Sequence, residues 1–428
     1  GIRRLVLVPV VALALVAAAC GDSGTTTAAP TTSAAPTTTA APTTTAAPTT
    51  AAPTTSEAGI DLAALEADLA AAVDAWMAEN HAPGVSLAVE LADGTLVTVA
   101  RGVADLDTGE AVTPDDYFRI GSISKTLTAA VVLQLVDEGL IDLDAPVADY
   151  LGPDWAPGSP FADIITVRQL MNHTNGFIEY AFDPGFYIQA AQRVETPYTP
   201  QEILQFVAGR EPLFEPGTDY SYETGGFVAA GLIIEKVTGN RAADEMRRRL
   251  FDPVGATELY LTPQEFPPSP VVHGYARAEL ADALLALNVL PPEEATHTVG
   301  DETFVDVLAG PQAVLQSAGW TGGGIEAQLD DLALVFGALF DGTLLSDAAL
   351  AEMTTTVPDH DYGLGLSVGE RAGHRTYSHG GGVPGFRSHA AYLPDDGITL
   401  AFSTNLIPVD PDVGALAADV IEIVTSLG

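Results

Sequence analysis

The chain has 428 residues, of which 47 % are hydrophobic, so it carries enough apolar side chains for a large buried core. Asp and Glu outnumber Lys and Arg by 57 to 17, and the formal net charge of −40 argues against a nucleic-acid partner. Lysine occurs only at Lys125 and Lys236. A lysine that stands inside a motif is therefore informative in this sequence.

The first 20 residues have the pattern of an export signal. Two arginines precede an apolar run from Leu5 to Ala19, which is too short to span a bilayer comfortably. The run ends in VAAAC, which resembles a bacterial lipobox, so we predict a signal peptide at 1–20 and a lipid anchor at Cys20. No disulfide is expected, because Cys20 is the only cysteine. The sequence thus predicts an exported, extracytoplasmic protein attached to the cell membrane.

Residues 21–58 differ in composition from the rest of the chain. They consist mainly of Thr, Ala and Pro in near repeats of AAPTTT, with no large side chain to bury. We predict a disordered linker, and the repeats from Thr25 to Thr55 alone reach up to roughly 90 Å at about 3 Å per residue. Composition does not distinguish a functional spacer from an inert stalk.

The structured part begins near Ile60. Small and apolar residues at helical spacing predict a helix from Leu62 to Met77, which ends at HAPG. The stretch VSLAVELADGTLVTVARG then predicts two strands joined by a turn at Asp93-Gly94. The folded region therefore opens with one helix and a hairpin.

Near the other end, HRTYSHGG, FRSHAAYLP and ITLAFSTNL predict three more strands, with a second turn at Asp396-Gly397, and a helix from Asp410 to Leu427 closes the chain. This order predicts an α/β (α+β) fold, in which an antiparallel sheet assembled from both termini is flanked by helices and a mainly helical lobe is inserted. The expected boundaries are 59–428 for the folded domain, about 59–120 and 355–428 for the sheet lobe, and about 121–354 for the helical lobe.

Ser122 and Lys125 stand one helical turn apart in the stretch FRIGSISKTL. The apolar pattern after them predicts a helix that starts at about Ser122 and stops at Gly139. Residues three apart share one face of a helix, so the Lys125 side chain can reach the Ser122 hydroxyl. By itself the pattern has a second interpretation, because serine is a common helix N-cap and lysine a common helix residue.

Two further stretches place polar residues at the ends of apolar elements. EPGTDYSYETGGFVAAGLIIEKVTG puts Tyr222 just before an apolar helix, and YSHGGGVPGFRS puts His379 and three glycines at the end of a strand. With Ser-x-x-Lys at Ser122, these motifs resemble the serine β-lactamases and penicillin-binding-protein-like hydrolases. The similarity is to the branch with class C β-lactamases, D-alanyl-D-alanine carboxypeptidases and esterases. It covers about residues 60–428, and ITVRQLMNHTNGF and YGLGLSVG accompany it.

The resemblance implies a role for each of these residues. Ser122 would be the nucleophile, Lys125 its ammonium neighbour or proton partner, and Tyr222 the general base. A free phenol titrates near pH 10, so ionising it at pH 7 costs about 4 kcal/mol, which nearby positive charge must offset. Lys125 is the obvious source, and a protonated His379 would add to it. His379 would otherwise bind substrate or share protons.

The same resemblance implies substrate contacts in the glycine-rich strand and the tyrosine motif. The N–H groups of Ser122 and Gly382 would form an oxyanion hole. His379-Gly380-Gly381 stands where many relatives carry Lys-Thr-Gly, so Gly381 would offer only backbone contacts. Thr224 stands where the family commonly has the asparagine of Tyr-x-Asn, so it lacks the amide that contacts a peptide or β-lactam. This departure favours an ester or an unusual amide as the substrate. Glu223 is expected to be a solvated turn residue.

Other chemistry has less support in the sequence. GLSVG at 365–369 matches the nucleophile elbow of α/β-hydrolases, with Ser367 as the nucleophile, but the stretch after it is polar and strand-like instead of helical. His173 is expected to be a structural turn residue. The eight histidines show no metal-ligand spacing, so neither a metal nor another cofactor is expected.

Two functions remain open. The favoured one is an envelope-tethered serine hydrolase that forms an acyl-enzyme with an ester, a D-amino-acid peptide or a β-lactam-type amide, on a small-molecule or peptidoglycan-derived substrate. The alternative is a noncatalytic peptidoglycan-binding or sensing domain with the same fold. The segment 263–317, which would shape the pocket, does not map onto the family pattern, and the sequence leaves the oligomeric state open.

Overall fold

The computed structural model describes residues 59–427 apart from short stretches within that range. The stretches left out are 184, 187–188, 190–192, 194, 208, 278–295, 300–301, 311 and 409–411. The predicted signal peptide, the predicted anchor residue Cys20 and the predicted linker lie outside the described residues, as does part of the segment 263–317.

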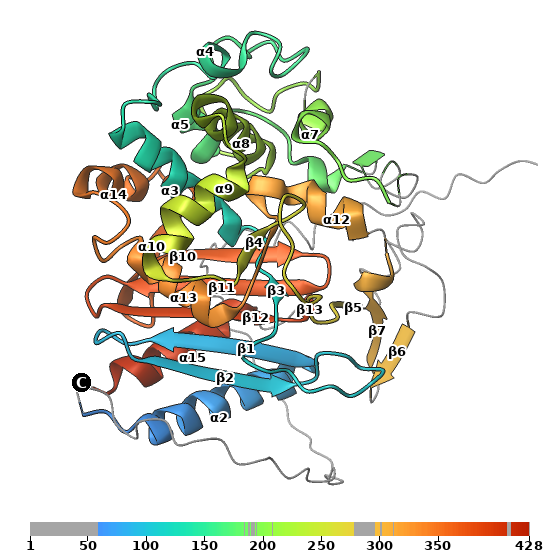
Figure 1. Cartoon of the computed structure of the whole chain (residues 1–428), viewed down its shortest axis with the longest axis vertical. Helices are drawn as coiled ribbons and strands as arrows, with labels where there is room; N and C mark the ends of the chain where they lie inside the picture. Colours follow the sequence, from blue (N-terminus) through green and yellow to red (C-terminus); the bar gives the residue numbers. More distant parts are fainter. Residues whose placement is uncertain are drawn as a thin grey trace, which may run out of the picture.

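The centre of the fold is a six-stranded sheet to which both ends of the chain contribute (Figure 1). The strand order is β2-β1-β12-β11-β10-β9, and every neighbouring pair is antiparallel. In this register Leu87 of β1 lies opposite Val99 on one side and Phe402 on the other. The strands are β1 Gly84–Glu90, β2 Leu96–Gly102, β9 Ser367–Arg371, β10 His374–Val383, β11 Phe386–Leu393 and β12 Ile398–Thr404. The predicted antiparallel sheet from both termini is confirmed.

Helices cover both faces of this sheet. α2 and α15, one from each end of the folded chain, pack together on one face, while α3 and α13 contact the strands from the other face (Figure 1). The helices α4, α5 and α7 gather around α8 as a lobe beyond α3. The α-helices are α2 Leu62–Asn80, α3 Ile123–Asp137, α4 Ala148–Leu151, α5 Val167–Met171, α7 Pro200–Val207, α8 Gly225–Thr238, α9 Ala242–Met246, α10 Asp252–Val254, α12 Gln312–Gly319, α13 Leu329–Ala338, α14 Asp347–Thr354 and α15 Val413–Thr425.

Further strands and short helical turns lie mostly in the middle of the chain. One small sheet has the order β3-β8-β4 and another the order β13-β5-β7-β6. These strands are β3 Phe118–Arg119, β4 Leu259–Leu261, β5 Tyr275–Arg277, β6 Thr296–Val299, β7 Glu302–Asp306, β8 Ile325–Ala327 and β13 Leu406–Ile407, and the turns are η1 Tyr180–Phe182, η2 Arg247–Phe251, η3 Val307–Ala309 and η4 Trp320–Gly322. β3 pairs with β8 directly before α3 begins, which fixes the entry into that helix.

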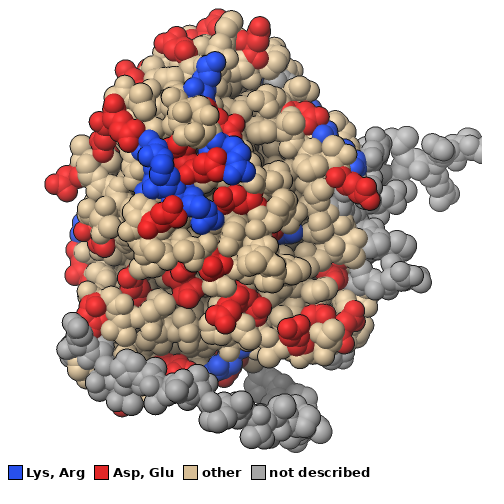
Figure 2. Space-filling view, viewed as in Figure 1, with Lys and Arg blue, Asp and Glu red and all other residues tan. Residues whose placement is uncertain are grey.

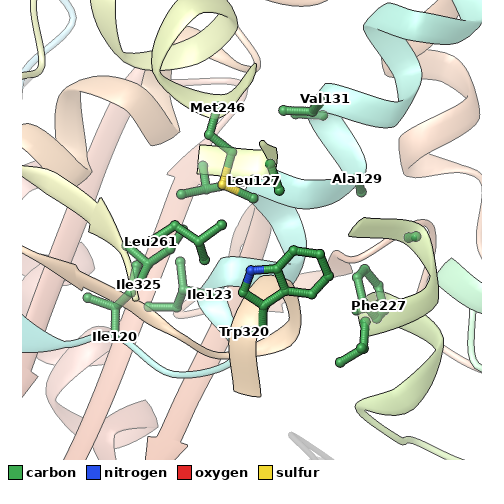
Figure 3. Close-up of a cluster of buried hydrophobic side chains, with 14 of the residues drawn as sticks. Ile120, Ile123, Leu127, Ala129, Val131, Phe227, Met246, Leu261, Trp320 and Ile325 are labelled. Carbon is green, nitrogen blue, oxygen red and sulfur yellow. The ribbon is translucent and has the colours of Figure 1, made fainter. Parts of the chain in front are cut away.

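Apolar packing fixes α3 between the sheet and the lobe (Figure 3). Leu127 and Val131 of α3 lie in one fully buried cluster with Phe227 of α8 and Met246 of α9. Burying side chains of this size contributes about 1.5–3 kcal/mol each, so the position of the helix is strongly determined. All residues from 123 to 133 are buried, and α3 therefore exposes no side to solvent over about three turns. Motif residues at its start are enclosed by protein.

Acidic side chains are spread over the surface, whereas basic ones gather in a patch in the view of Figure 2. The patch lies over α9 and the turn η2 after it, where Arg241, Arg247, Arg248 and Arg249 each form an ion pair with a carboxylate. Because these charges are neutralised within the fold, the patch offers little attraction to an anionic partner. Among the described residues, no helix is both long and apolar enough to cross a membrane.

Candidate active site

Ser122 follows a tight turn and stands at the start of α3. Gly121 has a φ of 54°, a conformation that glycine adopts without strain, and Ser122 is the N-cap residue with helical backbone angles. The Ser122 side chain makes no capping hydrogen bond, so its hydroxyl is not used by the helix. Ser124 has a structural role instead, because it donates to the Gly121 carbonyl over 2.7 Å and accepts from the Ile325 N–H over 3.2 Å. Ser122 thus begins the helix, as the pattern predicts, but its side chain does not cap it.

Lys125 is fully buried, and its ammonium group lies beside the Ser122 hydroxyl. Its Nζ is 3.1 Å from Ser122 Oγ, 3.2 Å from Thr224 Oγ1 and 2.8 Å from the Gly322 carbonyl oxygen. The Tyr222 ring centre lies 4.9 Å from Nζ, within the range of a cation–π interaction. The three polar contacts match the three N–H donors of an ammonium group, so the surroundings suit a charged Lys125.

Tyr222 and His379 come together from different elements, with their ring centres 6.2 Å apart. His379 Nδ1–H donates to the Gly380 carbonyl over 2.6 Å, so Nε2 accepts from the Tyr362 hydroxyl over 2.8 Å. Burial and the Lys125 charge lower the pKa of His379 to about 3. His379 is therefore neutral near pH 7, and it does not supply the charge that would help Tyr222 to ionise. Tyr362, which the sequence analysis quoted only within YGLGLSVG, holds His379 in this state.

Two backbone segments meet at close range beside Ser122. A Cβ atom at Gly381 would lie 1.9 Å from the Ile120 carbonyl oxygen, and one at Gly121 would lie 2.9 Å from the Gly382 nitrogen. Both positions therefore require glycine, and their approach brings the Gly382 nitrogen to the start of α3. Ser122 and Gly382 line the same cavity of about 110 Å³, which fits an oxyanion hole made by their N–H groups. Gly381 is not among the residues that line this cavity, and its absent side chain allows the approach.

Glu179, which the sequence analysis did not single out, joins the polar side of the site. Thr224 lines the cavity, donates to Glu179 Oε2 over 2.9 Å and accepts from Lys125. The Ala181 N–H donates to the other carboxylate oxygen over 2.9 Å. Burial raises the pKa of Glu179 to about 7, against the opposing effect of the Lys125 charge. A hydrogen-bonded chain thus runs from the ammonium group through Thr224 to a carboxyl that titrates near neutral pH.

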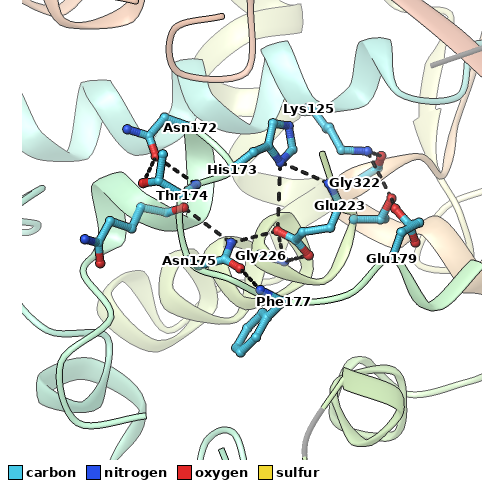
Figure 4. Close-up of polar contacts among 12 residues, drawn as sticks. Lys125, Asn172, His173, Thr174, Asn175, Phe177, Glu179, Glu223, Gly226 and Gly322 are labelled. Atoms are coloured by element: carbon cyan, nitrogen blue, oxygen red, sulfur yellow. Dashed lines mark hydrogen bonds and ion pairs between the residues drawn. The ribbon is translucent and has the colours of Figure 1, made fainter. Parts of the chain in front are cut away.

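Glu223 is fully buried, so the expectation of a solvated turn residue is wrong (Figure 4). Its carboxylate accepts from Asn175 Nδ2 over 2.8 Å and from the Gly226 N–H over 2.9 Å. Burial raises the pKa of Glu223 to about 6, although these hydrogen bonds lower it. The bonds tie the turn at Asn175 to the start of α8 and so fix Tyr222 and Thr224, the residues on either side of Glu223.

His173 has the structural role that its turn position predicts. It has a φ of 60°, is fully buried, and accepts from the Glu223 N–H through Nδ1 over 3.2 Å. Its ring centre lies 4.3 Å from that of Tyr222 and 4.7 Å from that of Tyr362. Burial and the Lys125 charge hold the pKa of His173 well below its usual range. A neutral imidazole therefore supports the Tyr222 ring.

The competing sequence motifs do not form sites. Ser367 is the first residue of β9 and lies opposite Ser378 in β10, so the strand, turn and helix of a nucleophile elbow are absent at this position. Across the described part of the chain, no three His, Cys, Asp or Glu side chains gather in a group that could hold a metal ion.

The serine and the buried lysine on one helical turn, the neighbouring tyrosine and the glycine-rich strand define a Ser-x-x-Lys serine hydrolase. Comparison with known proteins gives the same class, since residues 69–424 match the family model described as Beta-lactamase. The chain therefore belongs to the β-lactamase family, and it is a serine hydrolase of that family.

Several relatives cover most of the folded region. Penicillin-binding protein 4 of Amycolatopsis lactamdurans is 31 % identical over 344 residues, which span 78 % of this chain and 83 % of that protein. D-aminopeptidase of Brucella anthropi is 30 % identical over 73 % of this chain, but the match spans only 54 % of its own length. Among solved structures, a D-stereospecific amidohydrolase from Streptomyces sp. has a TM-score of 0.67 and 31 % identity, with 85 % of this chain and 98 % of that chain covered. D-amino acid amidase from Ochrobactrum anthropi SV3, complexed with L-phenylalanine amide, has a TM-score of 0.71 and 25 % identity, with 85 % and 99 % covered.

We expect Ser122→Ala to abolish covalent labelling by a fluorophosphonate probe and to lower turnover by at least about 10⁴-fold, because the attacking oxygen is lost. Intact-mass spectrometry locates and counts the adduct. Ser367→Ala is the matched control and should be labelled at the wild-type rate. Labelling of Ser122→Ala at that rate would rule out Ser122 as the nucleophile.

Proposed function

We propose that this enzyme hydrolyses amides of D-amino acids that carry a free α-amino group and an apolar side chain, through an acyl-enzyme at Ser122. The observation that carries the proposal is the Glu179 carboxyl, which is bonded to Thr224 at the edge of a cavity with mainly apolar walls. The D configuration is supported by similarity to a D-aminopeptidase, a D-stereospecific amidohydrolase and a D-amino acid amidase.

Glu179 has the capacity to bind an ammonium group. An ionised carboxylate offers about four acceptor positions, and Thr224 and Ala181 each occupy one, on different oxygens. The next two residues, Tyr180 and Ala181, line the cavity, so Glu179 directly precedes a segment of the cavity wall. A substrate ammonium bound there would form a charge-assisted hydrogen bond worth about 1.5–3 kcal/mol.

The rest of the cavity wall favours an apolar substrate side chain. Phe186, Leu315, Val383 and Ile407 are among the residues that line it. An apolar group gains about 25 cal/mol for each Å² it removes from water, whereas a charged group would lose its hydration without gaining a partner there. The polar and apolar parts of the site thus match the two ends of an amino acid with an apolar side chain.

Each step of the proposed reaction is assigned to one of the described residues. Ser122 Oγ attacks the amide carbonyl carbon while its proton passes to Tyr222, whose ionised form the nearby Lys125 charge favours. The N–H groups of Ser122 and Gly382 stabilise the oxyanion. Collapse of the intermediate breaks the C–N bond, the leaving amine takes the proton from Tyr222, and an ester remains on Ser122. Water attacks this ester with Tyr222 as base, which releases the amino acid and restores the serine.

A substrate panel tests the proposal. D-phenylalanine amide should be hydrolysed with a kcat/KM at least about tenfold above that of L-phenylalanine amide. In the L-amide the inverted configuration moves either the ammonium group or the scissile bond away from its position in the site. Acetylation of the amino group should lower kcat/KM about 10- to 100-fold, because the ion pair with Glu179 is lost. Faster turnover of nitrocefin or of the N-acetyl amide would contradict the assignment, and binding without any turnover would favour the noncatalytic alternative.

The pH dependence of kcat/KM tests Glu179 itself. Because burial raises the pKa of Glu179 to about 7, the carboxyl is neutral below this pH and charged above it. With D-phenylalanine amide, kcat/KM of the wild-type enzyme should therefore fall as the pH falls through about 7. The Glu179→Gln variant should lack this decrease, which forms the acidic limb of the pH profile. Near neutral pH, Glu179→Gln should also lower kcat/KM about 10- to 100-fold for the amide and change it little for the N-acetyl amide.

The exposed Glu215 provides the matched control for that measurement. Glu215→Gln should retain both the wild-type kcat/KM and the limb near neutral pH. A limb of unchanged position and depth in Glu179→Gln would show that another group is responsible.

We also propose that the enzyme works outside the cytoplasm, attached to a membrane through a lipid on Cys20. The support is the apolar run that ends in VAAAC, followed by the linker composition of residues 21–58. Expressed in a bacterium that processes lipoproteins, Cys20→Ser should lose palmitate labelling and move from the membrane fraction to the soluble fraction, with unchanged specific activity. Membrane association that survives this substitution would contradict lipid attachment at Cys20.

A further inference from the structure

Arg387 lies directly behind the glycine-rich end of β10. It belongs to β11, stands opposite Gly382 in the antiparallel register, and is 5 % exposed. Its Nε and Nη2 donate to the Asp412 carboxylate over 3.0 and 2.9 Å, and its Nη1 donates to the Gly381 carbonyl oxygen over 3.2 Å. Asp412 is itself held in place, because its Oδ1 accepts from the Val413 N–H as the N-cap of α15. The guanidinium group is therefore fixed between the last helix and the strand.

The carbonyl group that Arg387 contacts belongs to the same peptide unit as the Gly382 N–H. In a planar trans peptide the C=O and N–H bonds point in opposite directions. A hydrogen bond from Arg387 on the Gly381 oxygen therefore adds to the pairing of Gly381 with Ser388 in holding the direction of the Gly382 N–H. The Gly382 nitrogen lies close to the turn before Ser122, since a Cβ atom at Gly121 would be 2.9 Å from it. A cationic donor on the oxygen also withdraws electron density from the peptide nitrogen, which strengthens the N–H as a donor.

We propose that Arg387 is a positioning residue of the oxyanion hole, and that it orients and polarises the Gly382 N–H through the Gly381 carbonyl group. The inference rests on the proposed function, because an oxyanion forms only if Ser122 takes an acyl group. The guanidinium lies directly against the strand, since Cβ atoms at Gly380 and Gly382 would be in ordinary van der Waals contact with Arg387 Nη1, at 3.6 and 3.4 Å. The branched guanidinium suits this position, because it remains charged and can bind Asp412 and a carbonyl oxygen at once.

The test compares the full chain with Arg387→Met and Arg387→Lys, using p-nitrophenyl acetate labelled with carbon-13 at the carbonyl group. This ester has no amino group, so the result does not depend on Glu179. Removal of an oxyanion-hole donor lowers kcat about 10²–10³-fold, and a donor that is only misaligned should cost less. We expect Arg387→Met to lower kcat about ten- to a hundredfold with little change in KM, and Arg387→Lys to recover part of the loss.

Infrared spectra of the acyl-enzyme separate this role from a general loss of stability. Hydrogen bonds in the oxyanion hole lower the stretching frequency of the acyl carbonyl group, so its band should lie at higher wavenumber in Arg387→Met than in the wild type. Arg371→Met is the matched control, because Arg371 also joins a strand of the same sheet to α15, through the Gly414 carbonyl over 2.9 Å. This control should keep the wild-type kcat and band position.

The outcomes are distinct. A folded Arg387→Met variant with wild-type kcat and an unshifted band would overturn the inference. If that variant does not fold, Asp412→Asn replaces it, because this substitution retains the capping oxygen while loosening Arg387. It should change kcat and the band position in the same direction by a smaller amount. Wild-type values of both would equally overturn the inference. The absence of any acyl group on Ser122 in the wild-type chain would refute the proposed function and this inference with it.

Discussion

The site depends on the burial of one ammonium group, that of Lys125. It is fully enclosed, and taking an unpaired cation out of water would cost several kcal/mol. Contacts from three segments that are far apart in the sequence offset this cost: Ser122 at the start of α3, Thr224 before α8 and the Gly322 carbonyl group at the end of η4. The hydrogen bonds of a single cation therefore bring Ser122, the tyrosine motif and the cavity wall to one point.

Burial, and after it the same charge, determines the protonation states around Lys125. Burial together with this charge lowers the pKa of His379 to about 3 and holds that of His173 well below its usual range. The charge opposes the effect of burial on Glu179, whose pKa is about 7. Near neutral pH the site thus combines a cation, two neutral imidazoles, the Glu179 carboxyl with a pKa of about 7 and the Glu223 carboxyl with a pKa of about 6. Changes of activity near pH 7 should arise from these carboxyls, Glu179 first, and not from either histidine.

Thr224 links the chemical machinery to substrate recognition. An asparagine in this position would present an amide to the substrate, whereas the threonine hydroxyl accepts from Lys125 and donates to Glu179. In the proposed function, recognition is thereby transferred from a neutral amide to a carboxyl next to the cavity. This is the physical reason to prefer an amino-acid amide with a charged amino group among the esters and amides that the sequence left open.

The sequence by itself determined the parts of the site that follow from local periodicity. Ser122 and Lys125 are neighbours because they lie one turn apart on a helix, and His379 with its glycines ends a strand whose alternation is visible in the sequence. Tertiary structure decided the rest. The sequence predicts that Glu223 is a solvated turn residue, but the packing around Asn175 buries it. Three further contacts join separate segments and leave no local pattern: Glu179 with Thr224 across 45 positions, Tyr362 with His379 across 17, and Arg387 with Gly381 across a strand turn. Periodicity specifies which face of an element a side chain occupies, whereas only the packing of the lobe against the sheet decides which side chains meet and which carboxyl groups lose their water.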